Sequence, residues 1–496
     1  MMGLRLLALF LCLLGPLGAG ELGAGISRLL EASPTARHAF WGIRVVDLGK
    51  QDVLFSLNAD NPFVPASNTK LFTMALGLTR LGPDYRSTTL VMADQSPDAG
   101  GVVHGSLRLI GGGDPNLSAR AIPYRMGPNP GDPLQAIEEL AAQVAAHGVR
   151  RIEGDVVGDD SAYVWAPYPD GWAVDDAIWD YGAPVSALTI HDNAISLILQ
   201  PGAREGDPAR ISFFPPVEYY RVDNRVLTEN RVPENISVDR EPGSKQVRIW
   251  GSIPSRARAA TELLGIDDPA LYGATVFYNA LARRGVSIAG KPAVRHLYPN
   301  QVADLKTGAV PDAPAGVELA RRVSAPLLED LRITSKVSQN LHAELLLRAV
   351  GRARRNIGSR EAGLEEMACF LDEAGIGRDA YSIHDGSGLS RLNLVTPEAV
   401  VALLGYMYRS PNRESWLGLL PVGGRDGTLS GRFGATPAAG RILAKTGTLS
   451  HVSALSGYAE ARSGAMLAFS ILVNNYTAHA SGVQAIIDRI CNLMVE

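Results

Sequence analysis

A serine and a lysine stand three residues apart in Pro65-Ala66-Ser67-Asn68-Thr69-Lys70-Leu71, at the start of an apolar segment. On a helix, positions i and i+3 share a face, so both side chains would point into one space. A serine hydroxyl needs an adjacent base to become a strong nucleophile. Lys70 is a base only when neutral, which requires burial or nearby cations that lower its pKa from about 10.4 to near 7. The alternative is a helix-capping serine followed by an exposed lysine.

Two later motifs favour acyl-transfer chemistry. Ser338-Gln339-Asn340 is a Ser-x-Asn set among residues with helical periodicity. Lys445-Thr446-Gly447 precedes Thr448 in a segment that alternates like a strand. The ordered set Ser-x-x-Lys, Ser-x-Asn and Lys-Thr-Gly is the signature of penicillin-recognising serine acyl transferases.

The same short patterns also occur out of order. Ser56-Leu57-Asn58 fits Ser-x-Asn, and Lys306-Thr307-Gly308 fits Lys-Thr-Gly. Lys306 stands at the start of a predicted connection, residues 303–316, that is rich in proline and alanine, whereas Lys445 leads into two further strand-like segments. We therefore choose the later lysine as the member of the site.

Each motif residue has an expected part in acyl transfer. Ser67 would attack a carbonyl, and Lys70 would remove its proton. Ser338 would pass the proton to the leaving amine, and Asn340 would bind both Lys70 and the substrate amide. In this scheme the motif supplies the nucleophile, the base and the proton donor.

The Lys-Thr-Gly motif would bind the substrate. Lys445 would attract a substrate carboxylate and help to keep Lys70 neutral. The hydroxyls of Thr446 and Thr448, on either side of Gly447, would bind the same carboxylate. The backbone N–H groups of Ser67 and Thr448 would form an oxyanion hole, where one donor is worth about 10²–10³ in rate. No metal-ligand cluster in the sequence competes with the serine–lysine set as a catalytic centre. We therefore predict neither a metal nor another cofactor.

The composition describes an exported globular protein. The chain has 496 residues, of which 46% are hydrophobic and 20% charged, so two or more domains are expected. The net charge is −4 and no basic run indicates nucleic acid as a partner.

The first twenty residues, 1–20, are typical of a secretory signal peptide: they contain Arg5, an apolar run at 6–14 and small residues before Glu21. The alternative is a membrane anchor, but this run is too short to span a bilayer, and no later stretch is apolar enough.

Cysteine pairing stays open at the level of sequence. Cys369 and Cys491 remain after signal removal, and they could pair in an oxidising compartment. They could equally be buried apolar residues.

Hydrophobic periodicity predicts alternating helices and strands. A helix–glycine–strand unit occurs twice, which hints at two related pieces. The expected strands are 40–47, 53–57, 105–110, 152–157, 286–288, 442–449, 454–459 and 465–473. The expected helices include 67–81, 134–147, one around 276–281, 326–339, 341–350, one carrying Met367 and Phe370, and a final one containing Val483 to Met494.

The chain resembles the class C low-molecular-mass penicillin-binding proteins, the D-alanyl-D-alanine carboxypeptidase/endopeptidase family. Beyond the three motifs, the resemblance lies in the stretches 109–115, 182–184, 338–344 and 385–390. Ser67 and Ser338 are 271 residues apart, and the family has a large insertion at this place. Gln339 stands where many members have Asp.

The resemblance implies an α/β (α+β) transpeptidase-like domain with an antiparallel sheet flanked by helices. This domain would comprise residues 21–90 and 301–496, and a two-part insertion would comprise 91–300. The resemblance further implies a periplasmic or secreted serine D,D-peptidase that is acylated by β-lactams. It would remove the terminal D-Ala from peptidoglycan stem peptides or cut D-Ala-diaminopimelate cross-links between them. Asp159, Asp160 and Tyr163 are candidates for binding the stem peptide, with an exposed acidic turn as the alternative.

Two other functions compete with this hypothesis. The first is a serine β-lactamase or esterase of the same fold, which would differ in its rate of deacylation. The second is a non-catalytic protein that binds the cell wall. The complete motif set argues against the second, because binding alone needs no activated serine.

Overall fold

The computed structural model describes residues 19–127, 131–230, 233–308 and 315–496. The predicted signal peptide lies almost entirely outside the described residues, which begin with helix α1 (Ala19–Ala32). Within the described part of the chain, no helix is long and apolar enough to cross a membrane.

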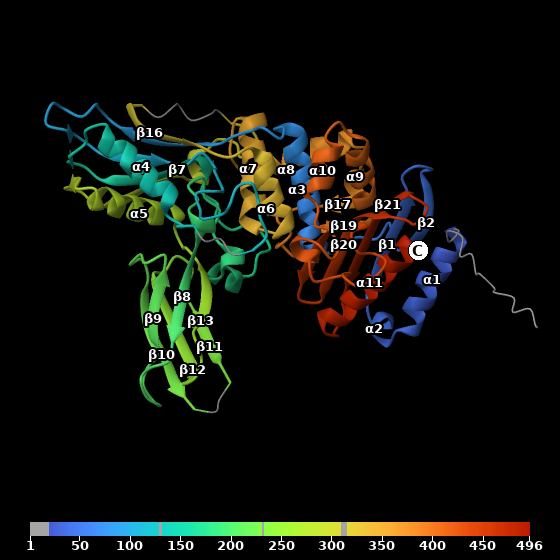
Figure 1. Cartoon of the computed structure of the whole chain (residues 1–496). Coiled ribbons are helices and arrows are strands. Elements are labelled where there is room, and N and C mark those ends of the chain that lie inside the picture. Colours follow the sequence, from blue (N-terminus) through green and yellow to red (C-terminus); the bar gives the residue numbers. More distant parts are fainter. Residues whose placement is uncertain (1–18, 128–130, 231–232, 309–314) are drawn as a thin grey trace, which may run out of the picture.

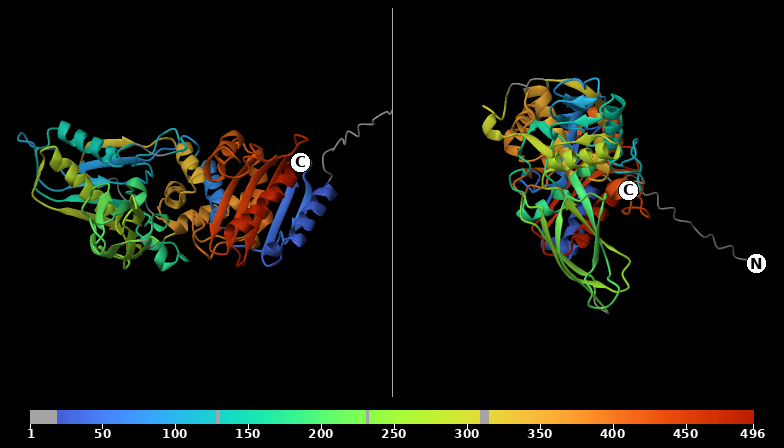
Figure 2. Two further views of the ribbon diagram at one scale, coloured as in Figure 1. Left: turned by 60° about the horizontal axis from the view of Figure 1, so that its bottom comes forward. Right: turned by 90° about the vertical axis from the view of Figure 1, so that its left-hand side faces the viewer.

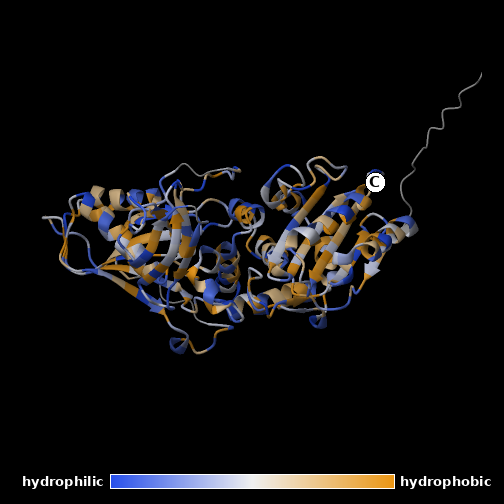
Figure 3. Cartoon of the chain, turned by 90° about the horizontal axis from the view of Figure 1, so that it is seen from below, coloured by the Kyte–Doolittle hydropathy of each residue, from blue (hydrophilic) through white to orange (hydrophobic). Residues whose placement is uncertain are grey.

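A five-stranded antiparallel sheet forms the centre of the domain that carries the motifs (Figure 1). Its strand order is β19-β20-β21-β1-β2, so the Lys-Thr-Gly strand β19 lies at an edge. Figure 3 shows hydrophobic residues along these strands, whose side chains alternate between two apolar layers. The strands are β1 (Phe40–Asp47), β2 (Asp52–Leu57), β19 (Ile442–Leu449), β20 (Val452–Glu460) and β21 (Met466–Asn474).

Helices cover both faces of this sheet. One face packs against α1 and the C-terminal helix α11 (Ala480–Val495), with Ile26 and Ile487 among the buried contacts. The other face packs against α9 (Pro397–Arg409) and the Ser-x-x-Lys helix α3 (Thr69–Arg80). The remaining helices of the domain are α2 (Pro34–Arg37), α6 (Leu327–Lys336), α7 (Asn340–Arg355), α8 (Arg360–Glu373) and α10 (Arg413–Leu419).

The first part of the insertion is a mixed sheet covered by two helices. Its strand order is β15-β7-β5-β3-β16, and a smaller sheet β14-β6-β4 lies beside it. The strands are β3 (Thr88–Ala93), β4 (Val102–Val103), β5 (Leu107–Ile110), β6 (Arg151–Ile152), β7 (Val156–Val164), β14 (Ser287–Ile288), β15 (Pro292–Leu297) and β16 (Val317–Val323). The helices are α4 (Gln135–Ala146) and α5 (Pro269–Arg283).

The repeated helix–glycine–strand unit has a structural counterpart here. Helices α4 and α5 pack against each other, and the strands that follow them, β6 and β14, pair in parallel. The two similar sequence units therefore lie side by side.

The second part of the insertion projects away from the rest of the molecule (Figures 1 and 2). It consists of two three-stranded sheets, β13-β8-β9 and β10-β12-β11. Their strands are β8 (Ala194–Gln200), β9 (Arg210–Phe214), β10 (Arg221–Glu229), β11 (Asn235–Asp239), β12 (Gln246–Pro254) and β13 (Ala260–Gly265). The insertion is thus in two parts, as predicted.

Most predicted elements agree with the structure, and the differences have local causes. The predicted helix 326–339 ends at Lys336 because Ser338 has a φ of 62°. The predicted strand 152–157 is divided into β6 and β7 at Gly154, which packs so closely on Gly105 that a Cβ would lie 2.6 Å from its backbone. Cys369 and Cys491 are not paired with each other.

Strand pairing bears on the domain boundaries. Strand β16 pairs with β3 from Val317 to Val323, although residues 301–323 were predicted to belong to the acyl-transferase domain. The predicted connection 303–316 lies partly outside the described residues. We propose that the insertion extends from about residue 86 to about residue 324.

Candidate active site

Ser67 lies in a tight 3-10 turn, η1 (Ala66–Asn68), that leads directly into α3. The preceding Ala66 has a φ of 49°, a left-handed conformation that is unusual for a residue with a side chain. Asn68 Nδ2 donates a hydrogen bond to the carbonyl of Lys445 at 3.0 Å. A Cβ on Gly447 would lie 2.7 Å from the carbonyl oxygen of Pro65, so only glycine allows β19 to approach the turn this closely.

Lys70 is completely buried and contacts three oxygen atoms. Its Nζ lies 3.0 Å from Ser67 Oγ, 2.6 Å from Asn340 Oδ1 and 2.6 Å from the carbonyl oxygen of Ser387. A neutral amine has two N–H donors and one lone pair. If the donors bind Asn340 and Ser387, the lone pair is left for the hydroxyl proton of Ser67.

Burial also sets the charge of this lysine. It lowers the pKa of Lys70 to about 7, although the carboxylates of Asp385 and Glu344 favour the charged form. A large fraction of Lys70 is therefore neutral near pH 7.

Ser338 and Lys445 form the other side of the site. Lys445 Nζ donates to Ser338 Oγ at 2.8 Å and to the carbonyl of Thr446 at 2.9 Å. Burial, followed by the charge of Lys70, lowers the pKa of Lys445 well below its usual range. Two buried ammonium groups repel each other, so a proton on one disfavours a proton on the other.

The turn 385–388 positions the carbonyl that Lys70 contacts. Glu344 Oε1 accepts hydrogen bonds from the N–H groups of Gly386 and Ser387 at 2.8 and 2.9 Å. The carboxylate of Asp385 accepts from Gly388 N–H at 2.8 Å and from Trp172 Nε1 at 3.0 Å. This contribution of Ser387 was not predicted, because it comes from a backbone carbonyl.

A polar cavity of about 530 Å³ opens beside Ser67. Ser338, Asn340 and Thr448 line it together with Gly388 and Arg391. The insertion supplies the opposite wall, through Gly171, Ala173, Asp175, Asp176 and Tyr181. The carbonyl of Tyr181 also accepts a hydrogen bond from Asn340 Nδ2 at 2.8 Å.

The three candidates for binding in the insertion lie elsewhere. Asp159, Asp160 and Tyr163 are buried residues of β7, and they are neither in an exposed turn nor among the residues that line the cavity. Asp160 accepts hydrogen bonds from Ser186 Oγ and binds the ring of His296 at 2.8 Å. Asp175 and Asp176 are the acidic residues that reach the cavity, and they were not among the predicted site residues.

A buried ionic network connects the Ser-x-Asn motif to the insertion. His342, in the first turn of α7, contacts Asp330 at 2.6 Å and Asp192 of the insertion at 3.0 Å. Asp192 also accepts from Gln339 Nε2 at 3.1 Å and pairs with Arg120. An Asp at position 339 would place a second carboxylate beside Asp192, so the neutral Gln suits this neighbour.

Comparisons with known proteins identify the family. The model of the D-Ala-D-Ala carboxypeptidase 3 (S13) family matches residues 22–493. A D-alanyl-D-alanine carboxypeptidase from Actinomadura sp. (strain R39) is 36% identical, over 93% of this chain and 82% of the relative. The penicillin-sensitive carboxypeptidase A of Dictyostelium discoideum is 28% identical, over 92% of this chain and 87% of the relative.

A solved structure has the same fold. The crystal structure of penicillin binding protein 4 from Haemophilus influenzae matches with a TM-score of 0.80 at 23% identity, covering 94% of this chain and 97% of that one. The chain belongs to the D-Ala-D-Ala carboxypeptidase 3 (S13) family, as the resemblance predicted.

We predict that Gly388→Ala disrupts the site. The new Cβ would lie 1.9 Å from the carbonyl oxygen of Ala66, and the φ of Gly388 is +85°. We expect a loss of about 2–4 kcal/mol in unfolding free energy, measured in urea, and at least a tenfold slower reaction of Ser67 with penicillin.

Gly375→Ala is the matched control. Gly375 also has a positive φ, but a Cβ there would meet no atom within 4 Å. We expect it to cost about 1 kcal/mol and to leave the penicillin reaction unchanged. Equal effects of the two substitutions would contradict the steric argument.

We predict that the His342 network stabilises the protein mainly below pH 9. Burial opposes protonation, but Asp330 and Asp192 raise the pKa of His342 to about 9. Because this pKa is raised on folding, the contribution is complete below about pH 6.5 and is lost as the pH rises through 9. The melting temperatures of the wild type and His342→Gln, measured from pH 6 to 9.5, should converge at high pH. A constant difference would contradict the ionic network.

Proposed function

We propose that this chain is a serine D,D-peptidase that hydrolyses the terminal D-Ala-D-Ala bond of peptidoglycan stem peptides through an acyl-enzyme on Ser67. Membership of the D-Ala-D-Ala carboxypeptidase family supports the reaction type. The observation that carries the choice of Ser67 is the set of contacts around Lys70 Nζ, which leave a lone pair for the serine hydroxyl.

Acylation begins when Ser67 Oγ attacks the carbonyl of the penultimate D-Ala and its proton moves to Lys70. The N–H groups of Ser67 and Thr448 are the proposed donors to the oxyanion. The C–N bond then breaks, and the leaving amine takes a proton from Ser338 Oγ. Lys70 then returns the proton taken from Ser67 to Ser338 Oγ, so the protons balance over the step.

The carboxylate of the leaving D-Ala would favour the reactive charge state. Its binding at Lys445 and Thr446 stabilises a proton on Lys445, which in turn disfavours a proton on Lys70 because the two amines repel. Correct binding of the substrate thus promotes the neutral base. A water molecule then hydrolyses the ester and releases the shortened peptide.

The charges that line the cavity support a stem peptide as the acyl part of the substrate. Asp175 and Asp176 lie in one wall of the cavity and Arg391 in another. Such a cavity complements a side chain that carries both an amino group and a carboxylate. We assign Asp159, Asp160 and Tyr163 no part in binding.

We further propose that the mature protein works outside the cytoplasm and binds β-lactams. The proposed signal peptide, residues 1–20, supports a periplasmic or secreted location. The penicillin binding protein 4 of Haemophilus influenzae, which has the same fold, has been solved in complex with a β-lactam. A β-lactam carries a reactive amide and a nearby carboxylate, the two features that Ser67 and Lys445 would engage.

Labelling with a fluorescent penicillin tests the nucleophile. We expect lasting label on the mature wild-type protein and none on Ser67→Ala, measured by gel fluorescence during a chase with unlabelled penicillin. Label that disappears within seconds would instead favour the β-lactamase. A folded wild type without any label would favour the wall-binding protein.

We predict that acylation depends on the charge of Lys70. Because burial lowers the pKa of this lysine to about 7, its basic form is lost as the pH falls below 7. The second-order rate with penicillin should fall about tenfold per pH unit below 7 and level off above it, when measured from pH 5.5 to 9. Lys70→Arg, which stays charged, should be inactive throughout. A flat profile in the wild type would contradict this assignment of the base.

A further inference from the structure

We propose that Arg240 is a positioning residue that holds the insertion side of the cavity beside Ser67 and thereby sets the selectivity for the acyl part of the substrate. Arg240 directly follows β11 in the projecting part of the insertion, residues 194–265. It acts through the insertion wall, which we define as residues 173–182. This inference rests on the proposed function and gives the projecting part a role in it.

The insertion wall has little regular structure of its own. It consists of two short 3-10 turns, η2 (Val174–Ile178) and η3 (Asp180–Gly182), and η2 presents Asp175 and Asp176 to the cavity. The turns are closed by bonds between residues three apart, such as the one from Trp179 N–H to the carbonyl of Asp176 at 3.1 Å. Because such turns are short and their hydrogen bonds have poorer geometry than those of an α-helix, neighbouring elements must fix the position of the wall.

The insertion wall is attached to two different parts of the molecule. On the catalytic side, the carbonyl of Tyr181 accepts a hydrogen bond from Asn340 Nδ2 at 2.8 Å. In the projecting part, Leu264 of β13 forms a single antiparallel bridge with Trp179. A Cβ on the next residue, Gly265, would lie 2.9 Å from the carbonyl oxygen of Trp179, so this strand packs directly on the wall. The wall therefore contacts both the catalytic site and β13.

Arg240 joins η2 to the end of β13. The residue is 4% exposed, and its Nη2 donates a hydrogen bond to the carbonyl of Ala177 in η2 at 2.8 Å. Its Nη1 donates to the carbonyl of Gly265 and to the hydroxyl of Tyr220. The guanidinium carbon lies 5.0 Å from the centre of the Tyr220 ring. One side chain thus binds the wall, the strand beside it and an aromatic residue of the projecting part.

The partners of Arg240 explain why its loss would release the wall. Among the described residues its hydrogen-bond acceptors are two carbonyl oxygens and a hydroxyl, and none is a carboxylate. A cation buried in this way depends on those oxygens and on the face of the Tyr220 ring. In return, the guanidinium satisfies the carbonyl of Ala177. Without it, this buried carbonyl would lose its donor, and η2 would lose its bond to the projecting part.

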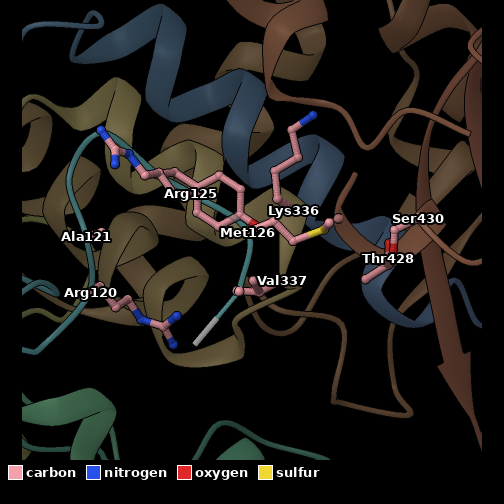
Figure 4. Close-up of a pocket in the computed structure, with 11 residues that line it drawn as sticks. Arg120, Ala121, Arg125, Met126, Lys336, Val337, Thr428 and Ser430 are labelled. Atoms are coloured by element: carbon pink, nitrogen blue, oxygen red, sulfur yellow. The ribbon is translucent and has the colours of Figure 1, made fainter. Parts of the chain in front are cut away.

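The projecting part does not reach the substrate cavities directly. On the insertion side, the cavity beside Ser67 is lined by Gly171 and by residues of the insertion wall. A neighbouring cavity of about 310 Å³ is lined by the segment of Arg120 and by Lys336 and Thr428, among others (Figure 4). Within the described part of the chain, no residue of the projecting part lines either cavity. Its influence on a substrate must therefore pass through the wall.

A displaced wall affects one class of substrate. Asp175 and Asp176 would attract the amino group on the acyl part of a stem peptide, so their position determines how tightly that peptide is held. Penicillin and a truncated D-Ala-D-Ala dipeptide lack this group. Displacement of the wall therefore lowers the preference for the full stem peptide, while Ser67 and Lys70 keep their own contacts.

The test compares two substrates with the mature protein. One is a stem peptide that ends in D-Ala-D-Ala and carries an amino group and a carboxylate on the side chain of its third residue, and the other is acetyl-D-Ala-D-Ala. For Arg240→Met, we expect the ratio of kcat/KM for the stem peptide to that for the dipeptide to fall about tenfold, through a higher KM for the stem peptide. The rate of penicillin acylation should stay within about twofold of the wild type.

Gly265→Ala is a second variant that leaves Arg240 in place. Its new Cβ would press on the carbonyl of Trp179 and displace the wall at a different contact. We expect the same ratio to fall, again with little change in penicillin acylation. This variant keeps the inference testable if Arg240→Met does not fold.

Arg258→Met is the matched control. Arg258 is an exposed arginine between β12 and β13 in the projecting part. It should leave both rates and their ratio at the wild-type values. An unchanged ratio in both Arg240→Met and Gly265→Ala would overturn the inference. An equal fall in the rates with both substrates and with penicillin would also overturn it, because it would show a purely structural role.

The wild type separates this inference from the proposed function. If it forms no acyl-enzyme with penicillin, the proposed function fails and the inference fails with it. If it is acylated and prefers the stem peptide, but both variants keep that preference, only the role of Arg240 fails. A wild type that is acylated but shows no preference would overturn the inference alone, because the wall would then select nothing.

Discussion

The structure of the site depends on keeping an uncharged lysine amine in a buried place. Among the described residues, Lys70 Nζ has three oxygen neighbours within hydrogen-bonding distance. Each comes from a different segment: the turn before α3, the start of α7 and the turn 385–388. A buried amine without such partners would be costly, and a fully charged one would be no base. Burial and the two nearby carboxylates, Asp385 and Glu344, act in opposite directions on its pKa and hold it near neutrality.

The insertion contributes hydrogen bonds to the groups that surround Lys70. The carbonyl of Tyr181 accepts a hydrogen bond from the side-chain amide of Asn340, and Trp172 Nε1 donates one to the carboxylate of Asp385. Asp192 binds both Gln339 and His342 at the start of α7. Segments far from the motifs in the sequence therefore fix the orientation of the groups that surround Lys70.

The sequence predicted those parts of the site that depend on side-chain type and local spacing. Strands 40–47 and 442–449 have the predicted bounds, because alternation of apolar residues is a local signal. The structure brings Ser67, Lys70, Ser338, Asn340 and Lys445 together. The carbonyls of Ser387 and Tyr181 could not be predicted, because a backbone acceptor has no residue-type signature.

The sequence also could not decide which acidic residues of the insertion line the cavity. Asp159 and Asp160 lie buried on β7, whereas Asp175 and Asp176 line the cavity, and only the tertiary packing distinguishes them. The pairing of β3 with β16 joins segments more than two hundred residues apart, so no local pattern marks that edge of the insertion.

The two ends of the insertion lie next to each other where they join the acyl-transferase domain. Ser87 and Ser324 hydrogen-bond to each other, through Ser324 N–H to the carbonyl of Ser87 at 2.9 Å and Ser87 N–H to Ser324 Oγ at 2.9 Å. The two ends of an insertion of more than two hundred residues therefore lie as close together as the two ends of a short hairpin. A change in the length of the insertion beyond this neck therefore need not alter the strand order of the host sheet, whereas the segments that carry Trp172, Tyr181 and Asp192 are tied to the site by their hydrogen bonds.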